Sequence, residues 1–510
     1  MKIFLIVLVC VLALILPALA AFGISYKLHT SGSTETLGKE ETVYTTKENG
    51  CRIANIPYDN YLKDTKVENG TVPEGLLEEN TTEENAAAIE KAIDKAGETG
   101  GTVVIPKGTY KITTVRLQSN ITLYIEKGAV LFSQSYEENQ ASATPLEKAV
   151  ILAENCENIR ITGGGTIDGN GLTYTNDPEA DEPLYALKEF NLYTRVLEAR
   201  KRIRMAKDGE RANLIRLENC KNVSVDNIVL KDSAFWTAVF ANCENVTIRN
   251  FIIDSHLHIA NGDGIDITGG KNYEISHCFI ATADDGIVIK SMDSDITNVT
   301  VTDCEICSFA NNFKIGTETE FDIADITVKD CFFFMPEGIT GGYSGLAVES
   351  ADGANIKNIN ISDIEMQGVS APLLVWLGNR LRRGCDTVGS IENVTVENIK
   401  ADNVEMPSAV TGIKGYNVKN ITLKGFDIRY RDTEQNLSVK KNPDEKSMNG
   451  YPEITRVSHI YFISHKFSKY WSLPCYGLFS RNTENLTVED FHCEKRTADT
   501  RECYCYENNI

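Results

Sequence analysis

The sequence predicts an all-β protein, a right-handed, single-stranded parallel β-helix with an N-terminal capping helix. The main observation is a short phrase, Asn-Val-Thr-Ile or a near variant, that recurs along most of the chain. In its central run the phrase advances by 23, 27, 26 and 27 residues, a period typical of one coil of a solenoid. The phrase begins at Asn158, Asn222, Asn245, Asn272, Asn298, Asp325, Asn358, Asn393, Asn420 and Asn485.

Each phrase predicts a short strand that follows a turn. Alternating β-branched residues favour a strand, and Asn or Asp favours the turn before it. Steps of about 35 and 65 residues indicate coils that carry loop insertions. Leucine-rich repeats have a similar period, but their leucine consensus is absent here, so the parallel β-helix is the better interpretation.

The first 80 residues are expected to lie outside the β-helix. Residues 1–20 predict an export signal, since Lys2 precedes an apolar run from Ile3 to Leu16 and a small-residue site at Ala18-Leu19-Ala20. An uncleaved membrane anchor is the alternative, because the apolar run approaches spanning length. We therefore expect a secreted protein, or an anchored one with the remaining chain outside. Residues 21–80 are polar and predict a lead-in or linker.

Residues 81–510 are expected to form the β-helix domain. A helical pattern runs from Thr82 to Ala96 and stops at Gly97, Gly100 and Gly101. Such a helix would cover the open strand edge of the first coil. A second helical stretch near 185–208 predicts an insertion, which either overhangs a groove or is simply solvated. Although 510 residues would ordinarily indicate several domains, a solenoid coil needs only its neighbours for a core.

Charge and cysteine content restrict the function further. The net charge of −21 argues against a nucleic-acid partner, whereas local cations could still bind an anionic polysaccharide. Three C-terminal cysteines, Cys493, Cys503 and Cys505, could include one disulfide. Six others recur at what we interpret as one repeat position and predict a ladder of small buried thiols: Cys156, Cys220, Cys243, Cys278, Cys304 and Cys331.

Three aspartates define the candidate site. Asp263 lies in Asn261-Gly262-Asp263, and Asp284-Asp285 follow one repeat later. Because stacked coils lie roughly 4.8 Å apart, equivalent positions become neighbours, and the three carboxylates should converge. Converging carboxylates suit acid/base chemistry, for which glycoside hydrolysis is the first candidate. The alternative is that these aspartates only cap turns.

Strand parity predicts which side chains surround these aspartates. In Ile287-Val288-Ile289-Lys290 the isoleucines should point inward and Lys290 outward. Extended over the next coils, this pattern predicts one outer face with charged groups and one aromatic platform, as in a saccharide groove. The platform residue would otherwise fill space beneath a loop. The face carries Asp266, Lys290, Lys314, Glu349 and Trp376 in register.

These motifs resemble those of glycoside hydrolase family 28, the polygalacturonase and rhamnogalacturonase group of parallel β-helix enzymes. The resemblance runs from Glu83 to the C-terminus and includes residues 100–110 and the glycine-rich phrase from Gly163. The family's Asn-Thr-Asp motif corresponds to Asn261-Gly262-Asp263, and its aspartate pair to Asp284-Asp285. The resemblance implies inverting hydrolysis, with Asp284 as general acid and Asp263 and Asp285 activating water. Inversion needs acid and base about 6.5–9.5 Å apart.

Two departures from the family pattern concern the substrate. The family's Gly-His-Gly site falls on Ala310-Asn311-Asn312, without the histidine, and its Arg-Ile-Lys motif falls on Ala347-Val348-Glu349, without either cation. Lys290, Lys314 and Arg380 are expected to supply charge from other positions. Lys290-Ser291 resembles the rhamnogalacturonase branch, so a rhamnogalacturonan-type pectic substrate is favoured over homogalacturonan.

The expected substrate-binding residues have alternatives as well. Asn261 could serve only the turn, Glu349 could pair with Lys314, and Arg380 could brace the loop that carries Cys385. The expected substrate-binding set is Asn261, Lys290, Asn311, Lys314, Glu349, Trp376 and Arg380.

Neither a cofactor nor a metal is expected, and we expect a monomer that acts on plant cell-wall polysaccharide or oligosaccharide. Two other functions fit the same fold. A polysaccharide lyase or epimerase would require a basic catalyst and often calcium. A non-catalytic carbohydrate-binding or adhesin solenoid would show no turnover.

Overall fold

The computed structural model describes most of the chain from Tyr44 onward. The export signal expected at 1–20 and the helical insertion expected near 185–208 lie outside the described residues. Within the described residues, no helix is both long enough and apolar enough to cross a membrane. The described ranges are 44–46, 52–67, 69–98, 100–175, 211–257, 259–336, 341–382, 384–431, 473–496 and 499–510.

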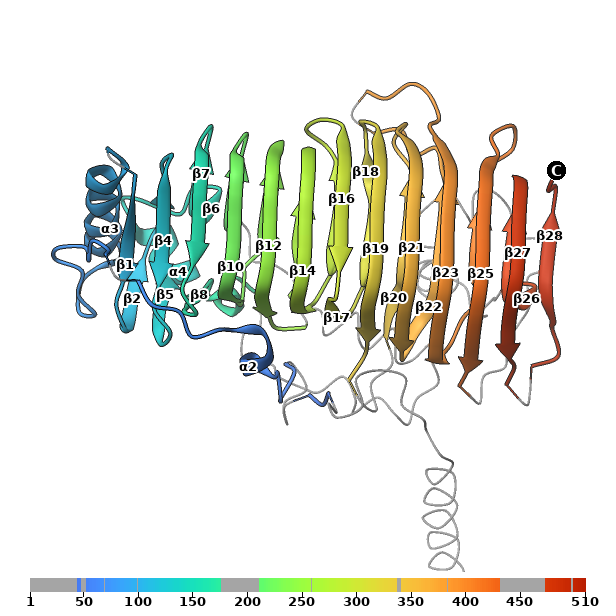
Figure 1. Cartoon of the computed structure of the whole chain (residues 1–510), viewed down its shortest axis with the longest axis horizontal. Coiled ribbons are helices and arrows are strands. Elements are labelled where there is room, and N and C mark those ends of the chain that lie inside the picture. Colours follow the sequence, from blue (N-terminus) through green and yellow to red (C-terminus); the bar gives the residue numbers. More distant parts are fainter. Residues whose placement is uncertain are drawn as a thin grey trace, which may run out of the picture. The chain divides into compact units, whose positions relative to one another are not determined.

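The fold is a right-handed parallel β-helix, which confirms the predicted class (Figure 1). Every pair of adjacent strands in its sheets runs parallel, as the register of β12 with β14 illustrates. The long sheet consists, in spatial order, of β1 (Gly101–Ile105), β4 (Ile121–Ile125), β7 (Glu157–Thr162), β10 (Lys221–Lys231), β12 (Cys243–Asp254), β14 (Gly270–Thr282), β16 (Ile296–Thr302), β19 (Ile323–Phe334), β21 (Asn355–Gln367), β23 (Ser390–Val404), β25 (Val418–Tyr430) and β27 (Thr483–Glu494).

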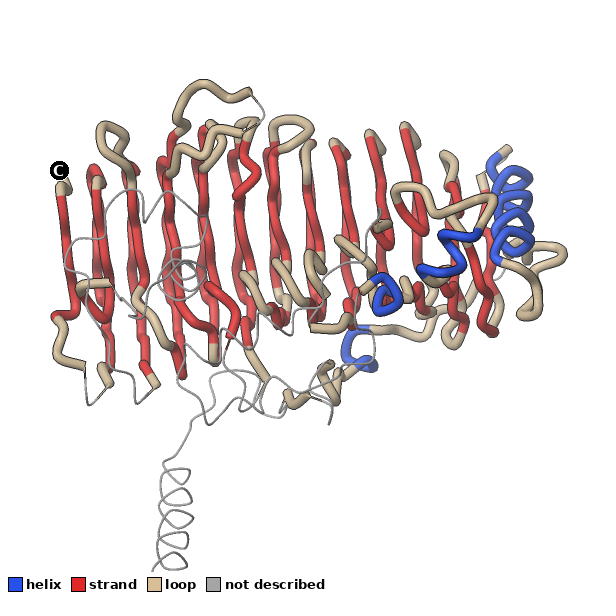
Figure 2. Tube along the Cα trace, turned by 180° about the vertical axis from the view of Figure 1, so that it is seen from behind, coloured by secondary structure: helices blue, strands red, loops and turns tan. Residues whose placement is uncertain are grey.

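A second sheet closes the coils from the other side (Figure 2). It consists of β3 (Val115–Arg116), β6 (Ala149–Glu154), β9 (Asn213–Glu218), β11 (Ala238–Ala241), β13 (Ile265–Ile267), β15 (Ile287–Ser291), β18 (Phe313–Thr319), β20 (Gly341–Ser350), β22 (Val369–Leu377), β24 (Ser408–Thr411), β26 (Cys475–Arg481) and β28 (Glu502–Glu507). Strands paired beside the long sheet are β2 (Gly108–Ile112), β5 (Ala129–Ser133), β8 (Thr166–Asp168) and β17 (Glu305–Ser308).

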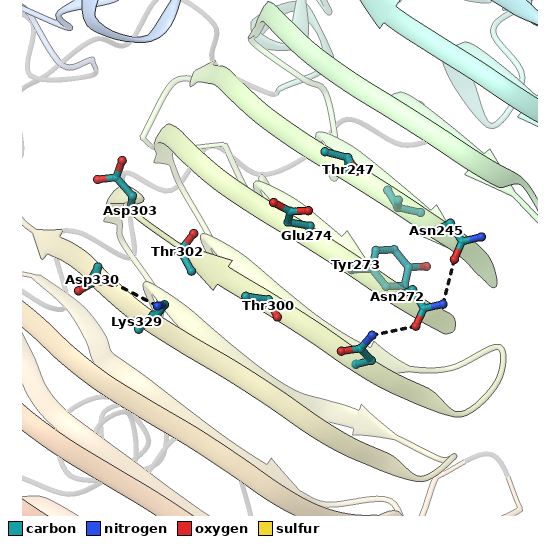
Figure 3. A pocket seen from close by; sticks show the side chains of 12 residues that line it. Asn245, Thr247, Asn272, Tyr273, Glu274, Thr300, Thr302, Asp303, Lys329 and Asp330 are labelled. Atoms are coloured by element: carbon teal, nitrogen blue, oxygen red, sulfur yellow. Dashed lines mark hydrogen bonds and ion pairs between the residues drawn. The ribbon is translucent and has the colours of Figure 1, made fainter.

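The repeated asparagine has two structural tasks, and both explain why the phrase recurs. At Asn245, Asn272 and Asn298 the backbone φ is 58°, 62° and 57°, a left-handed conformation that Asn adopts more readily than most residues. The side-chain Nδ2 of each also donates to the side-chain Oδ1 of the Asn one coil earlier, at 2.9 Å for Asn272 and Asn298 (Figure 3). The turn and the stacking of coils therefore depend on one residue type.

A polar furrow of about 620 Å³ runs beside this asparagine ladder on the outer face of the long sheet (Figure 3). Thr247, Glu274 and Thr300 occupy one row of it, because the registers of β12, β14 and β16 align them. Its lining contains none of the three predicted catalytic aspartates, which precede strands of the second sheet. The furrow is thus separate from the candidate site.

The interior confirms the predicted strand parity. Ile287, Ile289, Phe313 and Ile315 belong to the continuous buried core, whereas the outward Lys290 and Lys314 do not. Conserving this alternation from coil to coil lets each coil bury its apolar side chains against the next.

The cysteine prediction is confirmed in part. All twelve cysteines within the described residues are free thiols, so the C-terminal group contains no disulfide. The expected single row is wrong, however, because the β12–β14 register aligns Cys243 with Gly270 but Cys278 with Phe251. There are two short ladders: Cys156, Cys220 and Cys243 at one corner, and Cys278, Cys304 and Cys331 at another. A turn precedes the cysteines at both corners. The sequence pattern around the two positions is therefore similar, and it does not distinguish one ladder from the other.

The capping helix α3 (Thr82–Gly97) lies where the sequence predicts it, at the N-terminal end of the stack (Figure 1). Thr81 and Glu84 form a capping box, in which each side chain accepts the other residue's backbone N–H, at 3.2 and 3.0 Å. Ile89 and Ile93 are fully buried against the first coil. Shorter helical elements are α2 (Tyr58–Tyr61), α4 (Tyr136–Ala141) and η1 (Gly171–Tyr174).

The described part of the lead-in differs from the expected polar linker, because it packs on the β-helix. Tyr44 stacks on Phe334 with ring centroids 4.1 Å apart, and the Tyr61 ring lies 5.0 Å from that of His277. Arg52 forms ion pairs with Asp232 and Asp254. Several long-sheet strands have apolar side chains on both faces, so the outer patch around Phe279 needs a cover. The lead-in supplies it.

Candidate active site

The three predicted aspartates lie in the turns that lead into β13 and β15, and tight stacking brings these turns together. Gly264 N–H donates to the Asp285 carbonyl at 2.9 Å, and Gly286 N–H donates to the Asn311 carbonyl at 2.8 Å. A Cβ at position 264 would lie 2.3 Å from the Gly286 oxygen, and one at 286 would lie 2.5 Å from the Asn312 oxygen. Glycine at both positions therefore permits the close approach of consecutive coils.

Asp263 and Asp266 share one buried ammonium group. Lys290 Nζ lies 2.5 Å from Asp263 Oδ2 and 2.7 Å from Asp266 Oδ1. Burial raises the pKa of Asp263 well above its usual value, against the opposing effect of Lys290. Burial likewise raises the pKa of Asp266, to about 6. Burial alone would lower the pKa of Lys290, but the two carboxylates outweigh it and raise that pKa, so this amine stays charged.

Asp285 is held by Asn311 and Lys314, which come from the next coil. Asn311 donates its side-chain N–H to Asp285 Oδ1 at 2.7 Å, while its own amide oxygen accepts from Ser344 Oγ at 2.6 Å. Lys314 Nζ lies 3.3 Å from Asp285 Oδ2 and 3.7 Å from Glu349 Oε2. Asn311, expected to bind substrate, thus fixes the orientation of Asp285. Glu349 pairs with Lys314, as the alternative interpretation had it.

Asp284 differs from its two neighbours in exposure. Asp263 and Asp285 are only 3% and 5% exposed, whereas Asp284 is half-buried. Its backbone is fixed, since its carbonyl oxygen accepts from Ser308 Oγ at 2.6 Å and its N–H donates to the Gly262 oxygen at 3.2 Å. One accessible carboxyl group therefore lies beside two buried carboxyl groups that are held by amines.

The predicted outer face exists, but its residues do not lie in one register. The strand pairings align Asp266 with Val288 and Lys314, and they align Glu349 with Trp376. Lys290 lies two residues after Val288 on the same strand. It is therefore nearer the row of Glu349 and Trp376 than the row of Asp266 and Lys314. Parity determines which face a side chain occupies, whereas its position along the strand depends on where each turn ends.

The expectation that Trp376 forms a sugar platform is wrong. Trp376 points away from the main core as predicted, but it is only 1% exposed. It packs in a second apolar cluster with Leu374, Leu473 and Phe479. The alternative was that Trp376 fills space beneath a loop. Trp376 does fill space, but the residues that cover it include strand β26, about a hundred positions later in the chain.

Arg380 and Asn261 are also engaged with protein groups. Arg380 Nε donates to Asp352 Oδ1 at 3.0 Å, and its Nη2 donates to the Thr317 oxygen at 2.8 Å. Arg382 N–H binds the same carboxylate oxygen of Asp352, so Arg380 helps to brace this loop. Asn261 is exposed with φ 56°, and its Oδ1 accepts from Arg211 Nη2 at 2.9 Å.

Sequence reasoning missed an aromatic pair beside Lys290. Lys290 Nζ lies 3.8 Å from the centroid of the Trp236 ring, and Phe235 stacks on Trp236 at 5.2 Å and 10°. Arg211 covers Phe235, with Cζ 4.7 Å from the ring centroid. The available signal was the Phe-Trp dipeptide in the turn one coil before Asp263, since Thr237 N–H donates to the Asp263 carbonyl at 2.9 Å.

Glu318 is a second residue that the sequence did not reveal. Its Oε1 lies 3.2 Å from Arg380 Nη2. Burial alone would raise the pKa of Glu318, but Lys290, Lys314 and Arg380 together lower it. Glu318 is therefore a carboxylate that pairs with Arg380 and whose charged form is stabilised by all three cations that were expected to bind substrate.

The Trp236 contact leads to a test of how Lys290 is held. A cation–π contact of this kind contributes about 0.5–2 kcal/mol. Without the Trp236 ring, Lys290 should be held less firmly beside Asp263 and should lower the pKa of Asp263 less. In Trp236→Leu we therefore expect the acidic limb of the pH profile of kcat/KM to move to higher pH. Trp236→Phe keeps an aromatic face and should preserve the profile. A higher KM with an unchanged profile would instead identify Trp236 as a sugar-stacking surface.

Comparisons with known proteins find relatives of this chain in sequence and in fold. Residues 98–448 match the sequence profile of Glycosyl hydrolases family 28. An endo-polygalacturonase of Pectobacterium carotovorum subsp. carotovorum is 26% identical over 377 residues, which cover 70% of this chain and 87% of that protein.

Two solved structures share the fold at low identity. The family 28 exopolygalacturonase of Yersinia enterocolitica has a TM-score of 0.57 and 18% identity, covering 86% of this chain and 78% of that one. The surface protein and adhesin PfbA of Streptococcus pneumoniae has a TM-score of 0.54 and 14% identity, covering 86% and 100%. The fold by itself therefore does not distinguish a hydrolase from an adhesin, whereas the family match does.

Proposed function

This chain belongs to family 28 of the glycosyl hydrolases, and on that premise we propose that it hydrolyses glycosidic bonds in a pectic polysaccharide or oligosaccharide with inversion. The observation that carries the proposal is the division of the three aspartates into one accessible carboxyl group, Asp284, and two buried ones, Asp263 and Asp285. General acid catalysis needs a carboxyl group that can reach the leaving oxygen. Asp284 meets that requirement.

In the proposed mechanism Asp284 donates its proton to the glycosidic oxygen as the bond to the anomeric carbon breaks. Water held between Asp263 and Asp285 adds to the opposite face of that carbon and gives one proton to one of these two carboxylates. Lys290 and Lys314 hold these carboxylates in place. A pKa of Asp263 raised by burial makes it a stronger base closer to neutral pH.

We favour a rhamnogalacturonan-type substrate, in which acidic and neutral sugars alternate. Arg211 supports an acidic sugar near Asn261, because among the described residues its hydrogen bonds go only to backbone oxygens and an amide oxygen. On the other side of the aspartates, Lys314 and Arg380 already contact protein carboxylates. A polysaccharide substrate of the plant cell wall also agrees with the export signal expected at 1–20.

A product assay tests the proposal directly. The protein is incubated with rhamnogalacturonan and homogalacturonan fragments, with and without a chelator. New reducing ends, the ultraviolet absorbance of unsaturated sugars and the initial anomeric signal by NMR are recorded. We expect chelator-insensitive reducing ends of inverted configuration, formed faster from rhamnogalacturonan. An unsaturated product would contradict hydrolysis and favour the lyase, and retained configuration would contradict the single-displacement mechanism.

A further inference from the structure

The Glu318 carboxylate on the outer face of the second sheet forms an ion pair with Arg380, and the charges of Lys290 and Lys314 also act on it. Lys290 comes from β15, Lys314 and Glu318 come from β18, and Arg380 follows β22. Arg380 Nη2 lies 3.2 Å from Glu318 Oε1, and all three cations stabilise the charged form of Glu318. Such a convergence of cations is the arrangement that recognises a sugar carboxylate.

Glu318 is also the most accessible member of this group. Its side chain is 27% exposed, compared with 5% for Lys290, 4% for Lys314 and 13% for Arg380. A sugar that approaches this face therefore meets a carboxylate first, and the cations lie behind it. Other acidic side chains deepen the negative charge here, since Asp285 and Glu349 flank Lys314.

We propose that Glu318 is a specificity-determining residue that occupies the place of a substrate carboxylate, so that the subsite beside Lys314 accepts an uncharged sugar. This inference rests on the proposed function, and it names the class of sugar on one side of the cleavage point. A uronic acid at this subsite would bring a second carboxylate against Glu318. A neutral sugar avoids that repulsion, and its hydroxyl groups can donate hydrogen bonds to the exposed Glu318 oxygen.

Glu318→Gln tests the proposal as a gain of function, because glutamine keeps the shape and removes the charge. We expect the ratio of kcat/KM on homogalacturonan oligosaccharides to kcat/KM on rhamnogalacturonan oligosaccharides to rise by about tenfold, because the variant no longer repels a substrate carboxylate. Glu365→Gln is the matched control, since Glu365 lies on the long sheet, 3.9 Å from Lys400, and loses the same charge. The control should leave both rates unchanged.

Binding measurements separate this proposal from the proposed function. Calorimetric titration with trigalacturonate needs no turnover, and Glu318→Gln should bind it about tenfold more tightly than the unsubstituted protein at low salt, with a smaller gain at high salt. Equal affinity in both proteins would overturn the role of Glu318, even if hydrolysis is observed. Tighter binding without hydrolysis of any pectic fragment would support Glu318 and contradict the proposed function. If the glutamine variant does not fold, the same binding measurements on Glu318→Ala test the proposal, because alanine also removes the charge.

Discussion

Replacing Asp284 by asparagine should lower kcat on the preferred pectic fragment by about 10²–10⁴-fold, the range over which general acid catalysis contributes. Asparagine has the size of aspartate but no proton to give to the leaving oxygen. The contacts of residue 284 with Ser308 and Gly262 involve its backbone, and asparagine Oδ1 can still accept from Asp285 N–H as Asp284 Oδ1 does at 3.1 Å, so the fold should persist. The measurement is the rate of formation of reducing ends, together with KM, which should change little.

A substrate with an activated leaving group sharpens this test. An aryl glycoside of the preferred sugar needs little protonation, so Asp284→Asn should hydrolyse it at a rate much closer to that of the unsubstituted protein. The matched control is Asp330→Asn, because Asp330 is exposed on the long sheet and its φ of 54° suits asparagine. Full turnover of the natural fragment by Asp284→Asn would assign the acid to another residue.

Replacing Lys290 by methionine should destabilise the protein by about 3–5 kcal/mol at neutral pH, the usual effect of removing one partner of a buried ion pair. Lys290 lies within 2.7 Å of both Asp263 and Asp266, and all three side chains are buried. Activity should fall as well, since Asp263 would lose the cation that favours its ionised form. Urea unfolding and the hydrolysis rate measure the two effects.

The loss of stability in Lys290→Met should depend on pH. The folded pKa of Asp266 is raised from 3.8 to about 6, so its protonated form favours the folded state below pH 4, and that contribution is lost as pH rises through about 6. Without Lys290 the pKa values of Asp263 and Asp266 rise further, and the penalty for ionising them grows. We therefore expect a small loss at pH 4 and the full loss at pH 7.

Lys290→Arg is the control for this prediction, because it keeps a cation at the same position and should lose less stability at pH 7. Unfolding curves at pH 4, 5, 6 and 7 distinguish the electrostatic explanation from a simple packing defect. A loss of the same size at every pH would mean that the contacts of the lysine stem, and not its charge, stabilise this region.

The sequence by itself determined the features that repeat within a coil. The sequence patterns predict the strands, the inward and outward alternation and the capping helix at Thr82–Gly97. They also predict that the turn of Asp263 meets the turn of Asp284-Asp285. Each depends on residues that are near one another in the chain or one coil apart in a parallel stack. Period and parity are therefore sufficient to predict them.

Only the tertiary structure decided what covers the outer face and which charges meet there. Trp376 is buried by residues from Leu473 onward, and the apolar patch at Phe279 is covered by the lead-in around Tyr44. Likewise, Trp236 meets Lys290 and Glu318 meets Arg380 only because turns of unequal length end beside one another. Loop lengths and contacts between distant segments set these positions, and a repeat pattern carries no information about them.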